Sequence, residues 1–169
     1  MRRQVTTEEL QNLYTSIGRC VWHLQYVEDV LTNLITLKVE IRTPGRVGLK
    51  EAQELLAKHR RNTLGTSVKI VREKSLVRPE LLDRLTRFKE ERDWIIHRSQ
   101  QTHGDGLYTD QGRTEMFSRL ERFEKEAHSL MQAVAEELNE FMRGHGVDLA
   151  AAERIARQNI GRMRGGADV

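Results

Sequence analysis

The sequence predicts an all-α, up-and-down bundle of four to five helices that ends in a basic C-terminal helix. Apolar residues recur at every third or fourth position over two long stretches, residues 10–39 and 116–141, as they do on the buried faces of long helices. The composition agrees, because 31% of the residues are charged, 5% are aromatic and only 2 are proline. A β-sandwich would need more turn residues and more aromatic strands.

The first helix is predicted to start after Thr6, because Glu9 follows three positions later and the two residues can form a capping box. Pro44 and Gly45 predict the loop that follows this helix. Its apolar seam continues to about residue 39 and contains Leu10, Leu13, Ile17, Cys20, Leu24, Val27, Leu31 and Ile35.

The middle of the chain is predicted to hold shorter helices over residues 49–59 and 63–71, and a third main helix that starts at Pro79. Residues 100–112 are predicted to form a loop, because three glycines interrupt the pattern. The fourth main helix is predicted for residues 113–142. Two long seams of this kind are what an antiparallel bundle needs.

The domain organisation follows from these elements. We predict one bundle domain, residues 1–143, followed by a C-terminal helix and a flexible tail, residues 144–169. The last helix carries more arginine than acidic residues, so it is either an arm that holds an RNA backbone or docks on a partner, or a solvated basic helix. We identify no internal repeat.

Two other basic features are expected to be structural. His23 has no motif partner in the sequence, so we expect a satisfied structural histidine. The basic residues 58–61 could bind a phosphate, but cations also suit the C-terminal end of a helix, and we favour that interpretation.

The composition also bounds the class of protein. The formal net charge of +3 allows an anionic partner without requiring one. With Cys20 as the only cysteine, neither a disulfide framework nor a cysteine-based zinc site is expected. No apolar run reaches the roughly 18 residues of a membrane span, so we expect a soluble, cytoplasmic protein without a membrane partner. Phosphate-binding loops, the dinucleotide fingerprint and the His-Glu-x-x-His motif are absent from the sequence, so we expect no cofactor and no metal.

The strongest candidate for chemistry is residues 92–97, Arg-Asp-Trp-Ile-Ile-His, near the end of the third main helix. A guanidinium can grip a phosphate, and an imidazole can move a proton near neutral pH. Asp93 lies four residues before His97, so its carboxylate is expected to bond the ring and select its tautomer. Arg92 and His97 are about 140° apart around an α-helix, so we expect two copies of the chain to form one cleft across a dimer axis.

Residues 91–98, Glu-Arg-Asp-Trp-Ile-Ile-His-Arg, resemble the Arg-x4–6-His motif of the HEPN superfamily, in which a polar residue commonly follows the arginine. Members of that family are small four- or five-helix bundles with the motif late in the third main helix, followed by a loop and a long fourth helix. Residues 6–143 are organised in the same way. The resemblance implies a metal-independent ribonuclease, often a toxin or defence effector, that is active as a dimer.

We therefore expect a homodimeric endoribonuclease that cuts single-stranded RNA at a dimer cleft by acid–base catalysis. Arg92, Asp93 and His97 are the predicted catalytic residues, and Arg98 and Ser99 are predicted to contact the RNA. The alternative is a HEPN-like interaction module without catalysis, which binds an antitoxin or a nucleotidyltransferase. A helical DNA-binding protein is less well supported, because we find no helix-turn-helix with a basic second helix.

Overall fold

The computed structural model describes the backbone of residues 2–163, and its regular structure is helical. This confirms the all-α prediction. Within these residues the helices are α1 (Thr7–Ile35), α2 (Leu49–His59), α3 (Leu64–Glu73), α4 (Pro79–Asp93), α5 (Ser99–His103), α6 (Asp110–Gly144) and α7 (Leu149–Met163). Three irregular segments complete the order: the π-helical η1 (Thr36–Ile41) and η2 (Trp94–Arg98), and the 3₁₀ turn η3 (Asp105–Tyr108). Among the described helices, none is long and apolar enough to cross a membrane.

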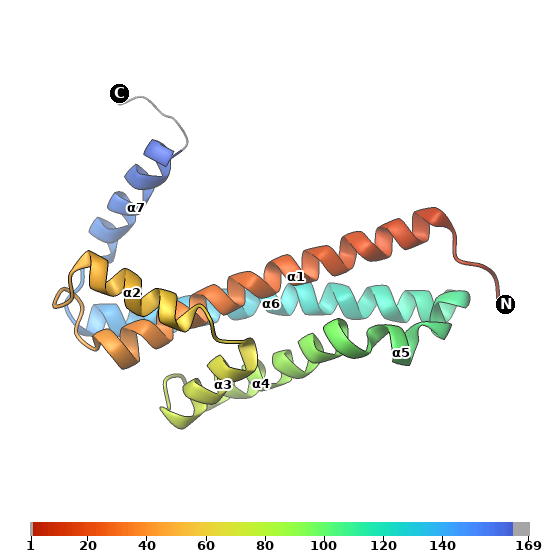
Figure 1. The fold of residues 1–169 in the computed structure, drawn as a ribbon, viewed down its shortest axis with the longest axis horizontal. Helices are drawn as coiled ribbons and strands as arrows, with labels where there is room; N and C mark the ends of the chain where they lie inside the picture. Colours follow the sequence, from red (N-terminus) through yellow and green to blue (C-terminus); the bar gives the residue numbers. More distant parts are fainter. Residues whose placement is uncertain (1, 164–169) are drawn as a thin grey trace.

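The bundle is up-and-down, as predicted, with α1, α4 and α6 lying side by side (Figure 1). Ion pairs fix the directions: Glu9 of α1 meets Arg113 near the start of α6, and Lys38 of η1, which continues α1, meets Glu137 towards the end of α6. The two long helices are therefore parallel. The reason is that α1, α2, α3, α4 and α6 alternate in direction, and an odd number of alternating helices leaves the first and last pointing the same way. The antiparallel neighbour of α6 in the bundle is α4, as the pairs of Arg84 with Glu126 and of Glu91 with Arg119 show.

The predicted starts of three helices are confirmed, whereas α6 starts at Asp110 and not at residue 113. Thr6 and Glu9 form the capping box that begins α1, and the Thr63 hydroxyl accepts a hydrogen bond from the Thr66 backbone N–H at the start of α3. Pro79 is the first residue of α4, where its missing N–H leaves no bond unmade.

The prediction of a loop over residues 100–112 is wrong. The chain continues as α5, turns through η3 and enters α6 at Asp110. Tertiary contacts order this segment: the Trp94 indole donates to the Thr102 hydroxyl at 3.0 Å, and the Arg113 guanidinium donates to the Leu107 carbonyl at 2.7 Å. A Cβ on Gly112 would clash with the Gly106 backbone, so glycine is required there for close approach and does not mark a flexible loop.

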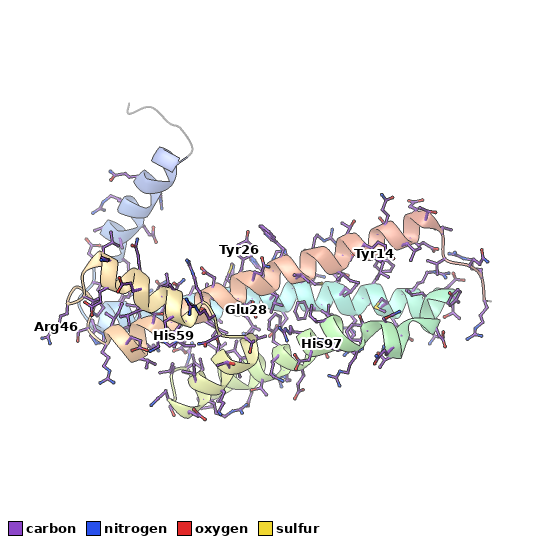
Figure 2. The ribbon with its side chains drawn as sticks, viewed as in Figure 1. Tyr14, Tyr26, Glu28, Arg46, His59 and His97 are labelled. Carbon is purple, nitrogen blue, oxygen red and sulfur yellow. The ribbon has the colours of Figure 1, made fainter. Side chains whose placement is uncertain are left out.

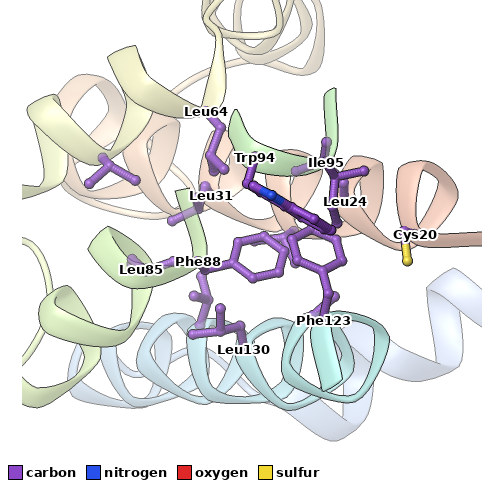
Figure 3. Close-up of a cluster of buried hydrophobic side chains, with 14 of the residues drawn as sticks. Cys20, Leu24, Leu31, Leu64, Leu85, Phe88, Trp94, Ile95, Phe123 and Leu130 are labelled. Atoms are coloured by element: carbon purple, nitrogen blue, oxygen red, sulfur yellow. The ribbon is translucent and has the colours of Figure 1, made fainter. Parts of the chain in front are cut away.

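The hydrophobic core lies where α1, α3, α4 and α6 meet (Figure 3). At its centre Phe88 of α4 stacks on Phe123 of α6, with ring centroids 4.4 Å apart. Other fully buried side chains around this pair are Val27, Leu31, Leu34, Ile35, Leu64, Val68, Val71, Leu85, Leu120, Leu130 and Val134.

The C-terminal helix is present as α7, which projects from one end of the bundle beside α2 (Figure 1). The predicted flexible tail at Gly165–Gly166 lies outside the described residues, as does Arg164, and the side chain of Arg162 is not described.

The same leucine-to-alanine substitution, made once in the core and once on the surface, tests the core assignment. Leu31 is fully buried, so Leu31→Ala should lower the free energy of unfolding by about 2–5 kcal/mol. Leu49 is 77% exposed, so Leu49→Ala should change it by less than about 0.5 kcal/mol. Urea denaturation of both variants measures the difference, and equal effects would contradict the packing described above.

Candidate active site

The candidate site lies where α4 changes its winding. The α-helix ends at Asp93, the π-helical segment η2 carries Trp94–Arg98, and α5 continues from Ser99. A π turn accommodates an extra residue in the helix and is found frequently at functional sites. The extra residue reduces the angle between Arg92 and His97 below the roughly 140° of a regular α-helix. The change of winding therefore moves the two side chains towards one side of the helix.

Trp94 fixes η2 in place. Its side chain is buried, and its indole N–H donates to Thr102 of α5. The Arg119 guanidinium of α6 lies 3.6 Å from the centroid of the Trp94 ring, a cation–π contact. Arg119 also donates two hydrogen bonds, 2.7 and 2.9 Å long, to the Glu91 carboxylate. The π segment is thus held from α6 on one side and from α5 on the other.

Arg92 continues the apolar seam of α4 after Leu81, Leu85 and Phe88, and its side chain is only 23% exposed. One terminal nitrogen, Nη1, donates to Asp93 at 3.0 Å. Its Nε atom is buried and has no hydrogen-bond partner among the described atoms. A buried donor without an acceptor costs free energy, so Arg92 occupies this seam position at the expense of stability.

Asp93 does not hold His97, contrary to the sequence-based expectation. Its two carboxylate oxygens accept from Lys89 at 2.7 Å and from Arg92 at 3.0 Å. The Lys89 hydrogen bond, and after it the Arg92 hydrogen bond, keep the pKa of Asp93 below its usual range. The physical reason is that Lys89 precedes Asp93 by one α-helical turn, whereas the π winding after Asp93 removes the regular four-residue register with His97. Asp93 therefore positions Arg92.

His97 and Arg98 are exposed on the outer side of η2, and Figure 2 shows His97 beside the junction of α4 and α5. No described hydrogen bond holds the His97 ring. Ser99 is half-buried and its hydroxyl donates to the Ile95 carbonyl at 2.8 Å, so its proton is already engaged. Of the two predicted RNA contacts, Arg98 is the one whose side chain is open to a phosphate.

A second basic feature lies between α4 and α6 and was missed from the sequence. It is a pocket of about 580 Å³, which we call the paired-arginine pocket, lined by Arg84, Arg87, Phe88, Glu91, Arg119, Arg122, Phe123 and Glu126. The sequence contains a signal for this pocket, because residues 84–91 and 119–126 share the pattern Arg-Leu-x-Arg-Phe-x-x-Glu. The conclusion that the sequence contains no internal repeat is wrong for these two segments.

The repeated segments meet in reciprocal pairs because α4 and α6 are antiparallel. Arg84 bonds Glu126 at 2.9 Å, and Arg119 bonds Glu91 at 2.7 Å. The corresponding arginines in the middle of each segment, Arg87 and Arg122, take part in none of the ion pairs found in the described part of the chain. Four arginines and two glutamates leave two positive charges in the pocket, which suits an anion.

Two other histidines have carboxylate partners, and the cysteine is buried. His23 pairs with Glu124, 3.4 Å away, and buried His59 contacts Glu40 at 2.9 Å. Burial raises the pKa of the Cys20 thiol to about 11, so it is a poor nucleophile. Among the described side chains, no group of three or more His, Cys, Asp or Glu residues could hold a metal ion.

Replacing Lys89 tests how Asp93 is held. Lys89→Met should raise the pKa of Asp93 towards its ordinary value of 3.8, because the largest cause of the lowering is removed. A depressed carboxyl pKa stabilises the fold above the unfolded-state pKa and loses this effect as the pH falls through the folded-state value. The variant should therefore lose less stability on acidification than the unmodified protein. NMR titration of the Asp93 carboxyl measures the shift. Lys69→Met, which removes an exposed pair with Glu73, is the control and should leave Asp93 unchanged.

No protein-family model, no curated protein and no solved structure matches this chain. The resemblance of residues 91–98 to the HEPN motif therefore depends on those residues and on the helical organisation around them.

Proposed function

We propose that the protein is a metal-independent endoribonuclease of HEPN type that cleaves single-stranded RNA. The observation that supports this proposal best is η2, whose winding moves a half-buried arginine and an exposed histidine towards one side of a packed helix. These are the two groups that RNA cleavage without a metal requires: a fixed cation for the phosphate and a group that exchanges protons.

In the proposed reaction His97 removes the proton from a ribose 2′-hydroxyl, and the 2′-oxygen attacks the adjacent phosphorus. The bond from phosphorus to the 5′-oxygen of the next nucleotide breaks, and that oxygen takes up a proton. The products are a 2′,3′-cyclic phosphate and a 5′-hydroxyl end. Arg92 stabilises the charge that develops on the phosphate oxygens, through the part of its guanidinium that does not bond Asp93. Asp93 and Lys89 hold Arg92 in place.

A second copy of the chain completes the proposed site. The reaction needs a base at the 2′-oxygen and an acid at the 5′-oxygen, which lie on opposite sides of the phosphorus, and η2 supplies one histidine per chain. Two copies related by a two-fold axis would supply two histidines and two arginines.

The paired-arginine pocket gives the proposed enzyme a further phosphate contact. Arg87 and Arg122 bring like charges to one pocket without a described carboxylate partner, and a phosphodiester group between them would relieve the repulsion. Glu91 at the rim of the pocket directly precedes Arg92, so an RNA bound here would run close to the cleavage site.

Replacing the histidine tests the chemistry. His97→Ala should lower the rate of single-stranded RNA cleavage in EDTA by about 10²–10⁴-fold, because the proton-transfer group is lost. His128→Ala is the matched control, since His128 is an exposed histidine on α6 outside the site, and it should keep full activity. Cleavage of a fluorescent RNA measures both rates, and equal activity in the two variants would remove His97 from the mechanism.

A salt titration tests the pocket separately from the chemistry. In a His97→Ala background that binds without cutting, Arg87→Gln with Arg122→Gln should weaken RNA binding. It should also reduce the slope of log affinity against log salt by about 0.7, because the phosphodiester group between the two arginines is one phosphate contact to a single strand. Arg46→Gln with Arg61→Gln changes the net charge equally at exposed sites away from the pocket. An equal loss in this control would show that net charge, and not the pocket, drives binding.

The alternative function is an interaction module that binds an antitoxin or a nucleotidyltransferase. One observation favours it: Arg92 already bonds Asp93, as a structural residue at a helix end would. Expression in cells separates the two functions, because an active toxin should slow growth and Arg92→Ala should restore it.

A further inference from the structure

The paired-arginine pocket carries more positive charge than one internal phosphate of an RNA strand can match. Arg84 is already engaged, because it donates to Glu126 at 2.9 Å and to the Ser129 hydroxyl at 2.8 Å. Arg87 and Arg122 take part in no ion pair and no side-chain hydrogen bond found in the described part of the chain. A phosphodiester carries one negative charge, so it leaves one of these two arginines without a counter-charge.

Arg87 and Arg122 occupy equivalent places on the two walls of the pocket. The repeated pattern puts each of them in the same position after its paired arginine, Arg84 on α4 and Arg119 on α6. Each lies between the two ion pairs that join α4 to α6. Both side chains are exposed, so both guanidinium groups can turn towards one ligand. Two arginines placed in this way can bind the same phosphate from opposite sides.

Ion pairs bridge the groove between α4 and α6 on either side of these arginines. The pair of Arg84 with Glu126 and the pair of Arg119 with Glu91 lie about two helical turns apart, or roughly 10 Å along the helices. The bridges obstruct a strand that follows the groove, so the chain on both sides of an internal phosphate would have to turn outward. A terminal phosphate has chain on one side only. The shape of the pocket therefore favours the end of a strand.

The size and the floor of the pocket suit a terminal nucleotide. Its volume of about 580 Å³ lies within the range of roughly 300–1,000 Å³ that is usual for small-molecule sites. The floor is apolar, because the stacked rings of Phe88 and Phe123 are only 2% and 4% exposed (Figure 3). Charges attract more strongly beside such a floor than in bulk water.

A phosphate monoester matches the pocket better than a phosphodiester. Its second pKa is about 6, so it carries close to two negative charges at neutral pH. This charge equals and opposes the net charge of the side chains that line the pocket. The three terminal oxygens of a monoester can also accept hydrogen bonds from Arg87 and Arg122 at the same time.

We propose that the paired-arginine pocket binds the terminal phosphate monoester of an RNA strand, with Arg87 and Arg122 on the two sides of the phosphate. The choice of RNA rests on the proposed function, and the proposal names the part of the substrate that the pocket takes. The strand leaves the pocket past Glu91, which directly precedes Arg92. Cleavage then falls close to the phosphorylated end.

The chemistry of the ends also places the substrate in a reaction sequence. The proposed cleavage creates a 2′,3′-cyclic phosphate and a 5′-hydroxyl, and neither of these new ends is a phosphate monoester. The monoester that enters the pocket must therefore come from another class of reaction, in which water hydrolyses a phosphodiester or a terminal triphosphate of the RNA.

Binding of a short oligoadenylate tests the pocket. In the His97→Ala background, strands with a 5′-phosphate and with a 3′-phosphate are compared with the same strand carrying hydroxyl ends. At least one phosphorylated strand should bind about tenfold or more tightly than the hydroxyl strand, because hydrogen bonds between charged groups are gained. Isothermal titration calorimetry measures the dissociation constants, and equal affinities for all three strands overturn the proposal.

Paired variants show whether the pocket causes the preference. Arg87→Gln with Arg122→Gln should abolish it, whereas Arg46→Gln with Arg61→Gln, which changes the net charge equally at exposed sites, should keep it. Circular dichroism checks that both proteins fold. A preference that persists in the pocket variant, or that is lost equally in the control, overturns the proposal.

Adenosine monophosphate distinguishes a free nucleotide from the end of a strand. It should bind more weakly than the phosphorylated oligoadenylate, and equal affinity would overturn the assignment to RNA. All of these measurements concern binding, so their outcome is separate from that of the cleavage assay. Cleavage without a preference for phosphorylated ends would overturn this proposal alone, and a preference without cleavage would overturn the nuclease alone.

Discussion

The candidate site depends on the way Trp94 is held. A π segment has poorer backbone geometry than an α-helix and needs tertiary contacts to persist. Trp94 provides them, because its buried ring contacts the Arg119 guanidinium while its N–H bonds Thr102. Cation–π contacts are worth about 0.5–2 kcal/mol, and the two hydrogen bonds from Arg119 to Glu91 join the same helix turn to α6. Without this anchor the helix would have no reason to leave regular winding between Arg92 and His97.

The position of Arg92 lowers the stability of the fold. Arg92 occupies a position in the apolar seam of α4, and its Nε is buried without a hydrogen-bond partner among the described atoms. A charged group at such a position lowers the stability of the fold. Leaving such a donor unmet costs about 1–3 kcal/mol. Conflicts of this kind are expected at functional sites, where stability is given up for binding. Asp93, itself bonded by Lys89, fixes the direction of the side chain by accepting from its Nη1.

A feature could be predicted from the sequence when the residues that form it lie close together along the chain. Helix starts at Thr6, Thr63 and Pro79 depend on residues a few positions apart, so the pattern contains them. The ordered turn at residues 100–112 depends on Trp94 and α6, and its glycines resemble loop glycines when the fold is unknown. The π winding of η2 has no sequence signal that we recognise, and it decides that Asp93 bonds Arg92 and not His97. The paired-arginine pocket was within reach, because its repeated pattern is visible once the two segments are aligned.

A continuous set of contacts connects α1 with Arg92. The Glu28 carboxylate on α1 (Figure 2) accepts from the Leu64 N–H at the start of α3. Next to it, a Cβ on Gly65 would lie 3.3 Å from the Lys89 side chain, so α3 closely limits where that lysine can sit. Lys89 in turn bonds Asp93, which bonds Arg92. The position of Arg92 therefore depends on α1 and α3 as well as on its own helix, because packed and hydrogen-bonded groups connect them.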